Sequence, residues 1–519
     1  MKTTRNLILI CLLVLGVRLA LGAAFVRYPA IADSNHYYNM GVRLVEGQGF
    51  TIDYIWQYNR PPEAVVHPED HWMPLAAVLA AIPMGALGIS TGASLVLFVL
   101  IGSLLPLIAY WGARQLKLQE SSAYYAALAA ALMPELVLNS LRTDTTVPTA
   151  LFVCLSLLLL NEGLWRGGWW RFAVSGAMVG LAYLTRNDGL LLIPMLAAVL
   201  IAYVLVRRGR AKVPLHWRGV VVWAAAMLLV MTPWLIRNWQ EFGAFGSAET
   251  DDMFFFTDHN DHYAYGRHFT LDTMLAAQTP AQIIGKRLFE MAAGIKVMIT
   301  GLGEVLAIGL AGGVAYLWVK RREHPERMLA ALPVIVLLVG AFVAYTVFIP
   351  YKAQAGSFKK AFLMTAPLLI PVAALAIERA IPYLRWRYGV MGLSLVILAA
   401  FAFDLVRLDN AGAAAYYPRI QAAAEQAETM PDTNGDGQII LMTQDPYALS
   451  YAGISSLMFP FENLDTTYEI ARRYGVDYLL MPSARPGIDV LLNGETDPRF
   501  NLVGSVAGTE YTFWRVEPE

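Results

Sequence analysis

The sequence predicts a mainly α-helical protein that crosses a membrane many times and carries a small α/β domain after its last span. Hydrophobic residues make up 57% of the chain, charged residues only 15%, and the mean hydropathy is +0.48. This balance differs from that of a soluble domain, in which about 25% of residues are charged. Long apolar runs recur from Ile8 to Val406, and Lys and Arg gather in every second gap between them.

Charge, cysteine content and the N-terminus narrow the classes of protein further. A formal net charge of −1 predicts no nucleic-acid partner. Cys11 and Cys154 both lie inside apolar runs, so neither a disulfide framework nor a cysteine metal site is expected. The apolar stretch that ends at Phe25 is longer than the core of a cleaved signal peptide, and we interpret it as an uncleaved first membrane helix.

The positions of the basic gaps predict the topology. A spanning helix needs about 20 apolar residues, and cytoplasmic loops collect Lys and Arg. If every basic gap is cytoplasmic, each adjacent pair of gaps encloses two crossings, which predicts about eleven spans in all. The N-terminus is then cytoplasmic in a multi-pass cell (plasma or inner) membrane protein, and the C-terminal domain is extracytoplasmic. The expected helices are 7–27, 90–112, 121–140, 147–163, 172–186, 189–206, 219–237, 293–319, 328–349, 361–380 and 388–406.

Two domains are expected, a transmembrane domain over 1–407 and an extracytoplasmic α/β domain over 408–519. The first outer loop, 28–89, should begin with an amphipathic surface helix that carries Tyr37, and its stretch 73–87 should lie along the interface. The tail alternates strand-sized apolar runs with a helical segment that ends in a glycine, as small α/β domains do. The expected strands are 438–443, 476–481, 500–506 and 511–516, and the helix is 466–475.

The polar residues of the expected outer face are the candidates for chemistry. Asp33 follows the first span, where a carboxylate can simply cap a helix in water or can lie at the lip of a cavity. Arg142 and Asp144 share one outer turn, and Arg186 and Asp188 share the next. Each of these pairs admits two interpretations, an ion pair that fixes its turn or a part of an active site.

Several motifs give the chain a family resemblance when they are taken in order. They are ADSNHYY ending in GQGF (32–50), Arg142-x-Asp144, GLAYLTRNDGLLLIP (180–194), TPWLIRNWQEFG (232–243), SFKKAFLMTAPLLIP (357–371) and YEIARRYGVDYLLM (468–481). In this order and topology the chain resembles the GT-C class of membrane glycosyltransferases. It is most similar to the family-39-like branch, which contains protein O-mannosyltransferases and aminoarabinose transferases. The resemblance implies a GT-C fold.

The resemblance also implies an activity. A sugar would pass from a polyprenyl-phosphate lipid to a glycan, lipid or protein acceptor on the extracytoplasmic side. Asp33 would be the catalytic base and Asp144 a second active-site carboxylate. A single carboxylate base can deprotonate the incoming hydroxyl, and cations stabilise the departing phosphate. With one base and no covalent intermediate, we expect inversion at the anomeric carbon.

The candidate binding residues follow from the same arrangement. Lys359, Lys360 and Arg237 are the candidates for binding the donor phosphate. The alternative is that these side chains, which lie at helix ends, only extend their charged groups to the membrane–water interface. Family members often read Arg-Tyr where this chain reads Lys-Lys-Ala-Phe, so the choice between the two lysines stays open. The expected substrate-binding residues are Tyr37, His67, Asp70, Arg142 and Arg186.

No metal ligand is assigned. His67, Glu69, Asp70 and His71 cluster in one loop, and Asp258, His259, Asp261 and His262 in another, which would suit a divalent ion. Neither segment has a recognised ligand motif, so no cofactor is predicted firmly. DTNGDG (432–437) resembles the start of a calcium loop, but Thr443 stands where the bidentate glutamate belongs, and a polar turn is expected.

Two other functions stay open. A flippase or transporter of lipid-linked sugars typically carries inverted repeats and ionisable residues at mid-membrane, whereas here these residues lie at outer helix ends. A transferase or polymerase that uses pyrophosphate-linked oligosaccharides is the second. Trp169 and Trp170 precede Arg171 on the basic side, which argues against a sequon-reading motif on the outer face.

Overall fold

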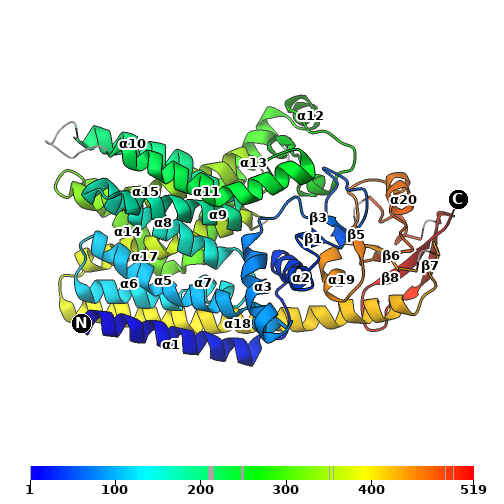
Figure 1. Ribbon diagram of the computed structural model, residues 1–519, viewed down its shortest axis with the longest axis horizontal. Coiled ribbons are helices and arrows are strands. Elements are labelled where there is room, and N and C mark those ends of the chain that lie inside the picture. The colour runs from blue at the N-terminus through cyan, green and yellow to red at the C-terminus, as the bar shows by residue number, and fades with distance from the viewer. Residues whose placement is uncertain are drawn as a thin grey trace.

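The computed structural model describes residues 2–207, 216–246, 251–349, 351–354, 356–435, 437–485, 487–494 and 496–518. Figure 1 shows a body of long helices that run side by side and, at one end of it, a domain of short helices and strands. The N-terminus lies at the far end of the helical body, and the C-terminus lies in the mixed domain. The expected fold class, mainly helical with a small C-terminal α/β region, is confirmed.

Seven helices of the described chain are long and apolar enough to cross a membrane, and two bent helix pairs raise this number to nine. The seven comprise α1 (Lys2–Phe25), α4 with α5 (Thr91–Ser94 and Val96–Gln115), α8 (Thr146–Arg166), η1 with α10 (Asn187–Leu191 and Leu192–Arg207), α11 (Trp217–Phe242), α15 with η4 (Pro325–Val343 and Ala344–Phe348) and α18 (Leu384–Glu428).

All eleven expected segments are helical, but the count of eleven spans is not established. The segment 121–140 is divided into α6 (Glu120–Leu132) and α7 (Pro134–Asn139), because Pro134 begins a new helix. The helix α9 (Trp169–Thr185) is short for a span, at 17 residues.

Two bends and one boundary differ from the expectation. The segment 293–319 is the end of α13 (Pro280–Leu302) and the whole of α14 (Glu304–Val319), which meet at 111° where Gly303 has a φ of 79°. The segment 361–380 is bent by 63° between α16 (Ser357–Leu363) and α17 (Ala366–Ala380). The expected boundary at 407/408 falls inside α18, which continues to Glu428 and reaches under the mixed domain (Figure 1).

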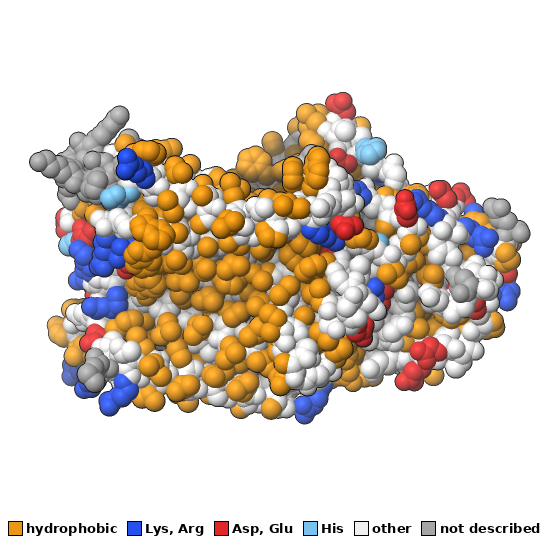
Figure 2. Space-filling view, viewed as in Figure 1, with side chains coloured by type: hydrophobic (Ala, Val, Ile, Leu, Met, Phe, Trp, Pro, Cys, Tyr) orange, Lys and Arg blue, Asp and Glu red, His pale blue; other side chains and the backbone are white. Residues whose placement is uncertain are grey.

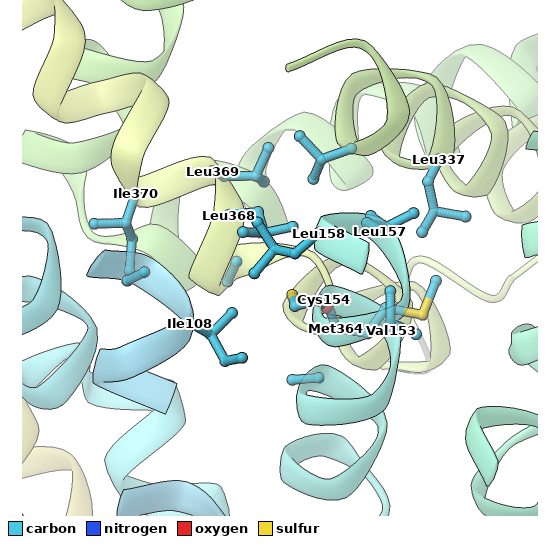
Figure 3. Packing of buried hydrophobic residues seen from close by; sticks show 14 of the residues in the cluster. Ile108, Val153, Cys154, Leu157, Leu158, Leu337, Met364, Leu368, Leu369 and Ile370 are labelled. Atoms are coloured by element: carbon cyan, nitrogen blue, oxygen red, sulfur yellow. Dashed lines mark hydrogen bonds between the residues drawn. The ribbon is translucent and has the colours of Figure 1, made fainter. Parts of the chain in front are cut away.

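The core of the helical body lies where α5, α8, α15 and α17 meet. Ile108, Leu157 and Leu337, from three of these helices, belong with Leu368 and Met364 to one cluster of buried hydrophobic residues (Figure 3). A backbone carbonyl that has no hydrogen-bond donor in apolar surroundings destabilises the fold, because no water can take the donor's place. At the break between α16 and α17, the Cys154 thiol donates to the Met364 carbonyl at 3.2 Å and so satisfies one such group.

The mixed domain is built on a six-stranded sheet in the order β2-β5-β4-β6-β8-β7. The four expected strands are present as β4 (Leu441–Thr443), β6 (Tyr478–Met481), β7 (Phe500–Ser505) and β8 (Thr512–Val516), and the expected helix as α20 (Leu464–Arg473). The sequence analysis missed β5 (Ser456–Met458) and α19 (Pro446–Tyr451). The described residues of DTNGDG, 432–435 and 437, form a turn in which Asp432 accepts three backbone N–H groups.

The first outer loop is part of this domain. Its strand β2 (Tyr54–Ile55) pairs in parallel with β5, and Tyr58 donates to the Met458 carbonyl. The expected amphipathic helix is α2 (Asp33–Val45), which packs on α3 (Leu75–Leu87). Residues 34–41 of α2 are all buried, so α2 is enclosed between the helical body and the mixed domain and does not lie on an open surface.

A close approach of two helices gives a stability prediction. The helices α9 and α11 pack so closely that a Cβ added at Gly176 would lie 2.0 Å from the carbonyl oxygen of Trp223. Because that oxygen is backbone, Gly176→Ala should destabilise the fold by about 1–3 kcal/mol and lower the Tm of the purified protein. Gly16→Ala is the control, since its Cβ meets nothing within 4 Å. Equal Tm values for the two variants would contradict this packing.

Candidate active site

The centre of the candidate site is one lysine between two carboxylates. The Nζ of Lys360 donates to Asp33 at 2.9 Å and to Asp144 at 2.5 Å. Asp144 is buried, and its other oxygen accepts from the backbone N–H of Thr146 at 2.8 Å and from its hydroxyl at 2.6 Å. The Asp33 side chain keeps 40% of its surface exposed, so it is the carboxylate that a substrate can reach.

The lysine sets the charge of both acids. Burial would raise the pKa of Asp33, but the Lys360 ammonium outweighs it and lowers the pKa below its ordinary value. Burial acts on Asp144 in the same direction, and Lys360 together with the Thr146 hydroxyl and amide holds the pKa of Asp144 well below its usual range. Both acids are therefore carboxylates at neutral pH.

The backbone before α2 fixes where Asp33 points. Ala32 has a φ of 63°, a left-handed conformation that costs a residue with a Cβ about 1–3 kcal/mol. Asp33 follows in the first turn of α2, where the helix dipole favours a negative charge. Tyr37 lies one turn further along and is buried at 3% exposure. The Thr143 hydroxyl donates to the Ser34 carbonyl at 2.5 Å and ties this turn to the loop of Asp144.

Two adjoining cavities meet at Asp33. We call them the cationic cavity, of about 290 Å³, and the aromatic cavity, of about 300 Å³. Ala32, Asp33, Arg186 and Ser357 line both. The other charged residues of the cationic cavity are Glu135, Arg142, Asp144, Lys359 and Lys360. The rings of the aromatic cavity are Tyr37, Trp56, His71, Trp72, His259, His262, Tyr263, Tyr345 and Tyr447.

Most cations of these cavities already have a carboxylate partner. Lys359 reaches Glu135 at 2.6 Å, Arg142 pairs with Asp409 of α18, and Arg186 pairs with Asp188 at 2.6 Å. The Asp188 carboxylate also accepts from the Tyr345 hydroxyl. Lys352, which lines the aromatic cavity, has no ion pair with any other described residue. An anion in the aromatic cavity would therefore meet the unpaired ammonium of Lys352, whereas an anion in the cationic cavity would have to draw the cations there away from their carboxylate partners.

Three of the expected site residues lie outside both cavities. Arg237 donates to the carbonyl oxygens of Glu69 at 2.5 Å and of Phe50 at 3.1 Å, and its guanidinium stacks on Trp234. His67 lies in β3 (His67–Pro68), which pairs with β1 (Thr51–Ile52), and its Nδ1 contacts the Val65 carbonyl. The neighbouring Asp70 is absent from both linings as well. Arg237 and His67 thus hold the first outer loop together.

The two histidine segments approach each other, but their carboxylates face elsewhere. His71, His259 and His262 all line the aromatic cavity. Asp258 accepts from the Asn260 amide, and Asp261 accepts from Thr257 and pairs with Arg267. Within the described ranges, no three His, Cys, Asp or Glu side chains come together as metal ligands. The imidazoles therefore have no acidic co-ligands in this arrangement.

Sequence reasoning missed several lining residues. Trp56 and Trp72 lie in the first outer loop, and their large aromatic side chains were the only feature of the sequence that could have indicated a place in the cavity wall. Tyr447 comes from α19 in the mixed domain, where Asn39 of α2 donates to its carbonyl at 2.8 Å. Tyr345 follows α15 in the helical body. The cavity thus draws its walls from the first loop, the helical body and the C-terminal domain, and no single stretch of sequence shows it.

The chain is similar to known membrane glycosyltransferases in part of its sequence and in its fold. Residues 66–236 match the family model of dolichyl-phosphate-mannose-protein mannosyltransferases. The model superposes on ArnT from Cupriavidus metallidurans bound to undecaprenyl phosphate with a TM-score of 0.61 at 15% identity, over 100% of this chain and 99% of that one. The chain has the GT-C fold. The expected resemblance to GT-C glycosyltransferases is confirmed.

Other solved structures share the fold. The apo state of the same ArnT gives a TM-score of 0.60 at 15% identity, with 100% of this chain and 99% of that chain covered. The oligosaccharyltransferase of Archaeoglobus fulgidus in its apo form gives 0.53 at 14% identity, with 91% and 69% covered. None of the curated proteins matches the chain in sequence. At these identities the likeness is one of fold.

Proposed function

We propose that this protein is an inverting membrane glycosyltransferase that moves a sugar from a polyprenyl-phosphate lipid to an acceptor. The observation that carries the proposal is the Asp33–Lys360–Asp144 cluster at the junction of a cationic and an aromatic cavity. The family match and the GT-C fold support a glycosyltransferase. Undecaprenyl phosphate, bound in the similar ArnT, supports a donor of the lipid-phosphate class.

The chemistry assigns one task to each part of the site. The acceptor oxygen or nitrogen attacks the anomeric carbon, and the bond from that carbon to the phosphate oxygen breaks. The lipid phosphate leaves with the electron pair, and cations stabilise the charge that it gains. Asp33 takes the proton of the acceptor. Its lowered pKa makes it a modest base, which suffices because a phosphate is a good leaving group.

The substrate groups divide between the cavities. The cationic cavity suits the phosphate, with Lys359 and Lys360 as its contacts and Arg142 and Arg186 nearby. The aromatic cavity suits the sugar and the acceptor, since such sites combine rings with a few polar groups, here including Tyr37. Arg237 has its guanidinium on backbone carbonyls, so its place in the proposal is structural. The acceptor is a glycan, a lipid or a protein, and it supplies the attacking oxygen or nitrogen.

A lysine comparison tests the place of the phosphate. Lys359→Met should weaken the binding of undecaprenyl phosphate to the purified protein by about 10- to 100-fold, because it removes a charge-assisted hydrogen bond. Lys352→Met removes the ammonium of the aromatic cavity and should leave this affinity nearly unchanged. Thermal stabilisation by the lipid, titrated in nanodiscs, measures both. The opposite result would move the phosphate to the aromatic cavity.

The role of Asp33 is the central prediction. Asp33→Asn keeps the size of the side chain but cannot take a proton, and it should lower turnover by about 10²–10⁴-fold. Turnover is measured by mass spectrometry after the purified protein is incubated with envelope membranes of a strain that lacks the gene, which supply donor and acceptor. Because the pKa of Asp33 is below its ordinary value, wild-type turnover should lose nothing to Asp33 protonation between about pH 5 and neutrality.

Two controls accompany Asp33→Asn. The variant should still bind undecaprenyl phosphate, since both phosphate contacts, Lys359 and Lys360, are kept. Asp53→Asn changes another carboxylate of the same loop, one that pairs with Arg43 outside both cavities, and it should keep its turnover. Undiminished transfer by Asp33→Asn would refute Asp33 as the base, and a wild-type protein that transfers no sugar under the same conditions would refute the proposed function.

We further propose that the site faces the extracytoplasmic side of the cell membrane. In Figure 2, Lys and Arg gather at the end of the helical body away from the mixed domain, beyond a broad apolar band. Cytoplasmic loops are the ones enriched in these residues. This supports a cytoplasmic N-terminus and an extracytoplasmic C-terminal domain.

Cysteine labelling tests this orientation. Ser483 in the mixed domain and Trp169 at the start of α9 are both exposed, and each can be replaced by Cys in a chain whose own two cysteines are changed to Ser. Ser483→Cys should react with an impermeant maleimide from outside, and Trp169→Cys only after the membrane is permeabilised. The reverse pattern would overturn the orientation.

A further inference from the structure

A buried acid lies beneath the wall of the aromatic cavity. The Glu69 side chain is 0% exposed, and its Oε1 accepts from the backbone N–H groups of His71 and Trp72, each at 2.6 Å. Both of these residues line the aromatic cavity. Glu69 therefore holds the backbone that presents one wall of the cavity to the substrate.

The second oxygen of Glu69 faces the helix of the proposed base. Its Oε2 lies 3.6 Å from Nε2 of His36, which is also 0% exposed. At this distance the two atoms are not hydrogen-bonded, and neither has a hydrogen-bond partner among the described residues. His36 lies one turn after Asp33 on α2, stacks on Trp72 with ring centroids 3.9 Å apart, and contacts the Tyr54 hydroxyl through Nδ1. The acid thus connects the base-bearing helix to the cavity wall.

The nearby cation does not neutralise this acid. Arg237 donates to the backbone carbonyl of Glu69 and not to its carboxyl group. A buried carboxylate without a cation on it is costly, whereas a protonated carboxyl can donate its O–H to a neutral imidazole. His36 Nε2 is placed to accept that O–H once the two side chains come within hydrogen-bond distance, and its Nδ1–H would then donate to Tyr54. Protonation of Glu69 would in this way give a partner to two buried atoms that otherwise have none.

We infer that Glu69 acts as a neutral, protonated positioning residue, which holds Trp72 and His71 against α2 so that the cavity wall keeps its place beside Asp33. This inference rests on the proposed function for its activity test. Glu69 touches no cavity itself and is not a catalytic residue. Its proton is the one that links Oε2 to His36.

The charged and titratable groups around Glu69 agree with this protonation state. Burial raises the pKa of Glu69 to about 8, and burial lowers the pKa of His36 to about 3, so both are neutral at pH 7. As the pH rises through about 8, Glu69 loses its proton and leaves a negative charge beneath the wall. The groups that face it are His36 and Tyr37 of α2, Tyr54 of β2, Asp70 and His71 of its own loop, and Arg237 of α11.

A pair of substitutions tests the inference. Wild-type turnover, measured with the same membranes, should fall as the pH rises above about 8. Glu69→Gln can accept both N–H groups and donate to His36 but cannot ionise, so this alkaline loss should disappear while kcat at pH 7 stays within about twofold. Glu69→Ala should lower kcat by about 10-fold or more, because small misplacements at a site are costly. Glu63→Gln, in an exposed part of the same loop, should behave like wild type.

A second readout does not depend on activity. The infrared absorption of a protonated carboxyl should be present in wild type near neutrality, disappear above about pH 8, and be absent from Glu69→Gln. An unchanged alkaline loss in Glu69→Gln, or the absence of this band from wild type, would overturn the inference. Neither result bears on Asp33 or on the proposed function, because the transfer of sugar by the wild-type protein at pH 7 tests that function separately.

Discussion

The site depends on one ammonium group shared by two carboxylates. Lys360 comes from α16, Asp33 from α2 and Asp144 from the loop before α8, so this single contact joins three parts of the chain. Without the lysine, two negative groups would face each other in a largely buried place. Breaking a buried ion pair typically costs about 3–5 kcal/mol, and the partial exposure of Asp33 reduces that cost. The cluster is therefore a structural requirement before it is a chemical one.

The first outer loop and the C-terminal domain form one wall around that cluster. The loop contributes β2 to the C-terminal sheet, and the domain contributes Tyr447 to the aromatic cavity. The helix α18 runs without a break from the helical body into the mixed domain. These connections explain why α2 is buried over most of its length. They also hold the strained backbone at Ala32, which a free loop would relax.

The sequence predicted what is periodic or local in this fold. Runs of about 20 apolar residues marked most of the long helices, and strand-sized runs marked four of the six strands of the C-terminal sheet. The bend at Gly303 lay hidden inside one apolar run, because a glycine there fits a straight helix as well as a positive φ. The strand β2 has only two residues, too few to show an alternation. Because this strand could not be recognised, the sequence analysis did not predict that the first outer loop and the C-terminal domain form one wall.

The members of the candidate site could be named singly from the sequence, but their arrangement as a set could not. Asp33, Asp144 and Lys360 were each expected from their positions at helix ends, yet Asp33 and Lys360 are 327 positions apart in the chain, and nothing local indicates that they share a hydrogen bond. Arg237 was also named from its position at a helix end, but its guanidinium donates to backbone carbonyls and lies outside both cavities.

The polar groups of the first loop perform two different physical tasks. Asp33 keeps its charge because a cation balances it at the edge of the cavities, where a substrate can arrive. Glu69 lies deeper, with only backbone amides and a neutral imidazole on its oxygens, and burial favours its uncharged form. A charge there would stand beneath the cavity wall with no cation on its carboxyl group. A neutral Glu69 avoids that cost, and the loop still gains the hydrogen bonds that fix its shape.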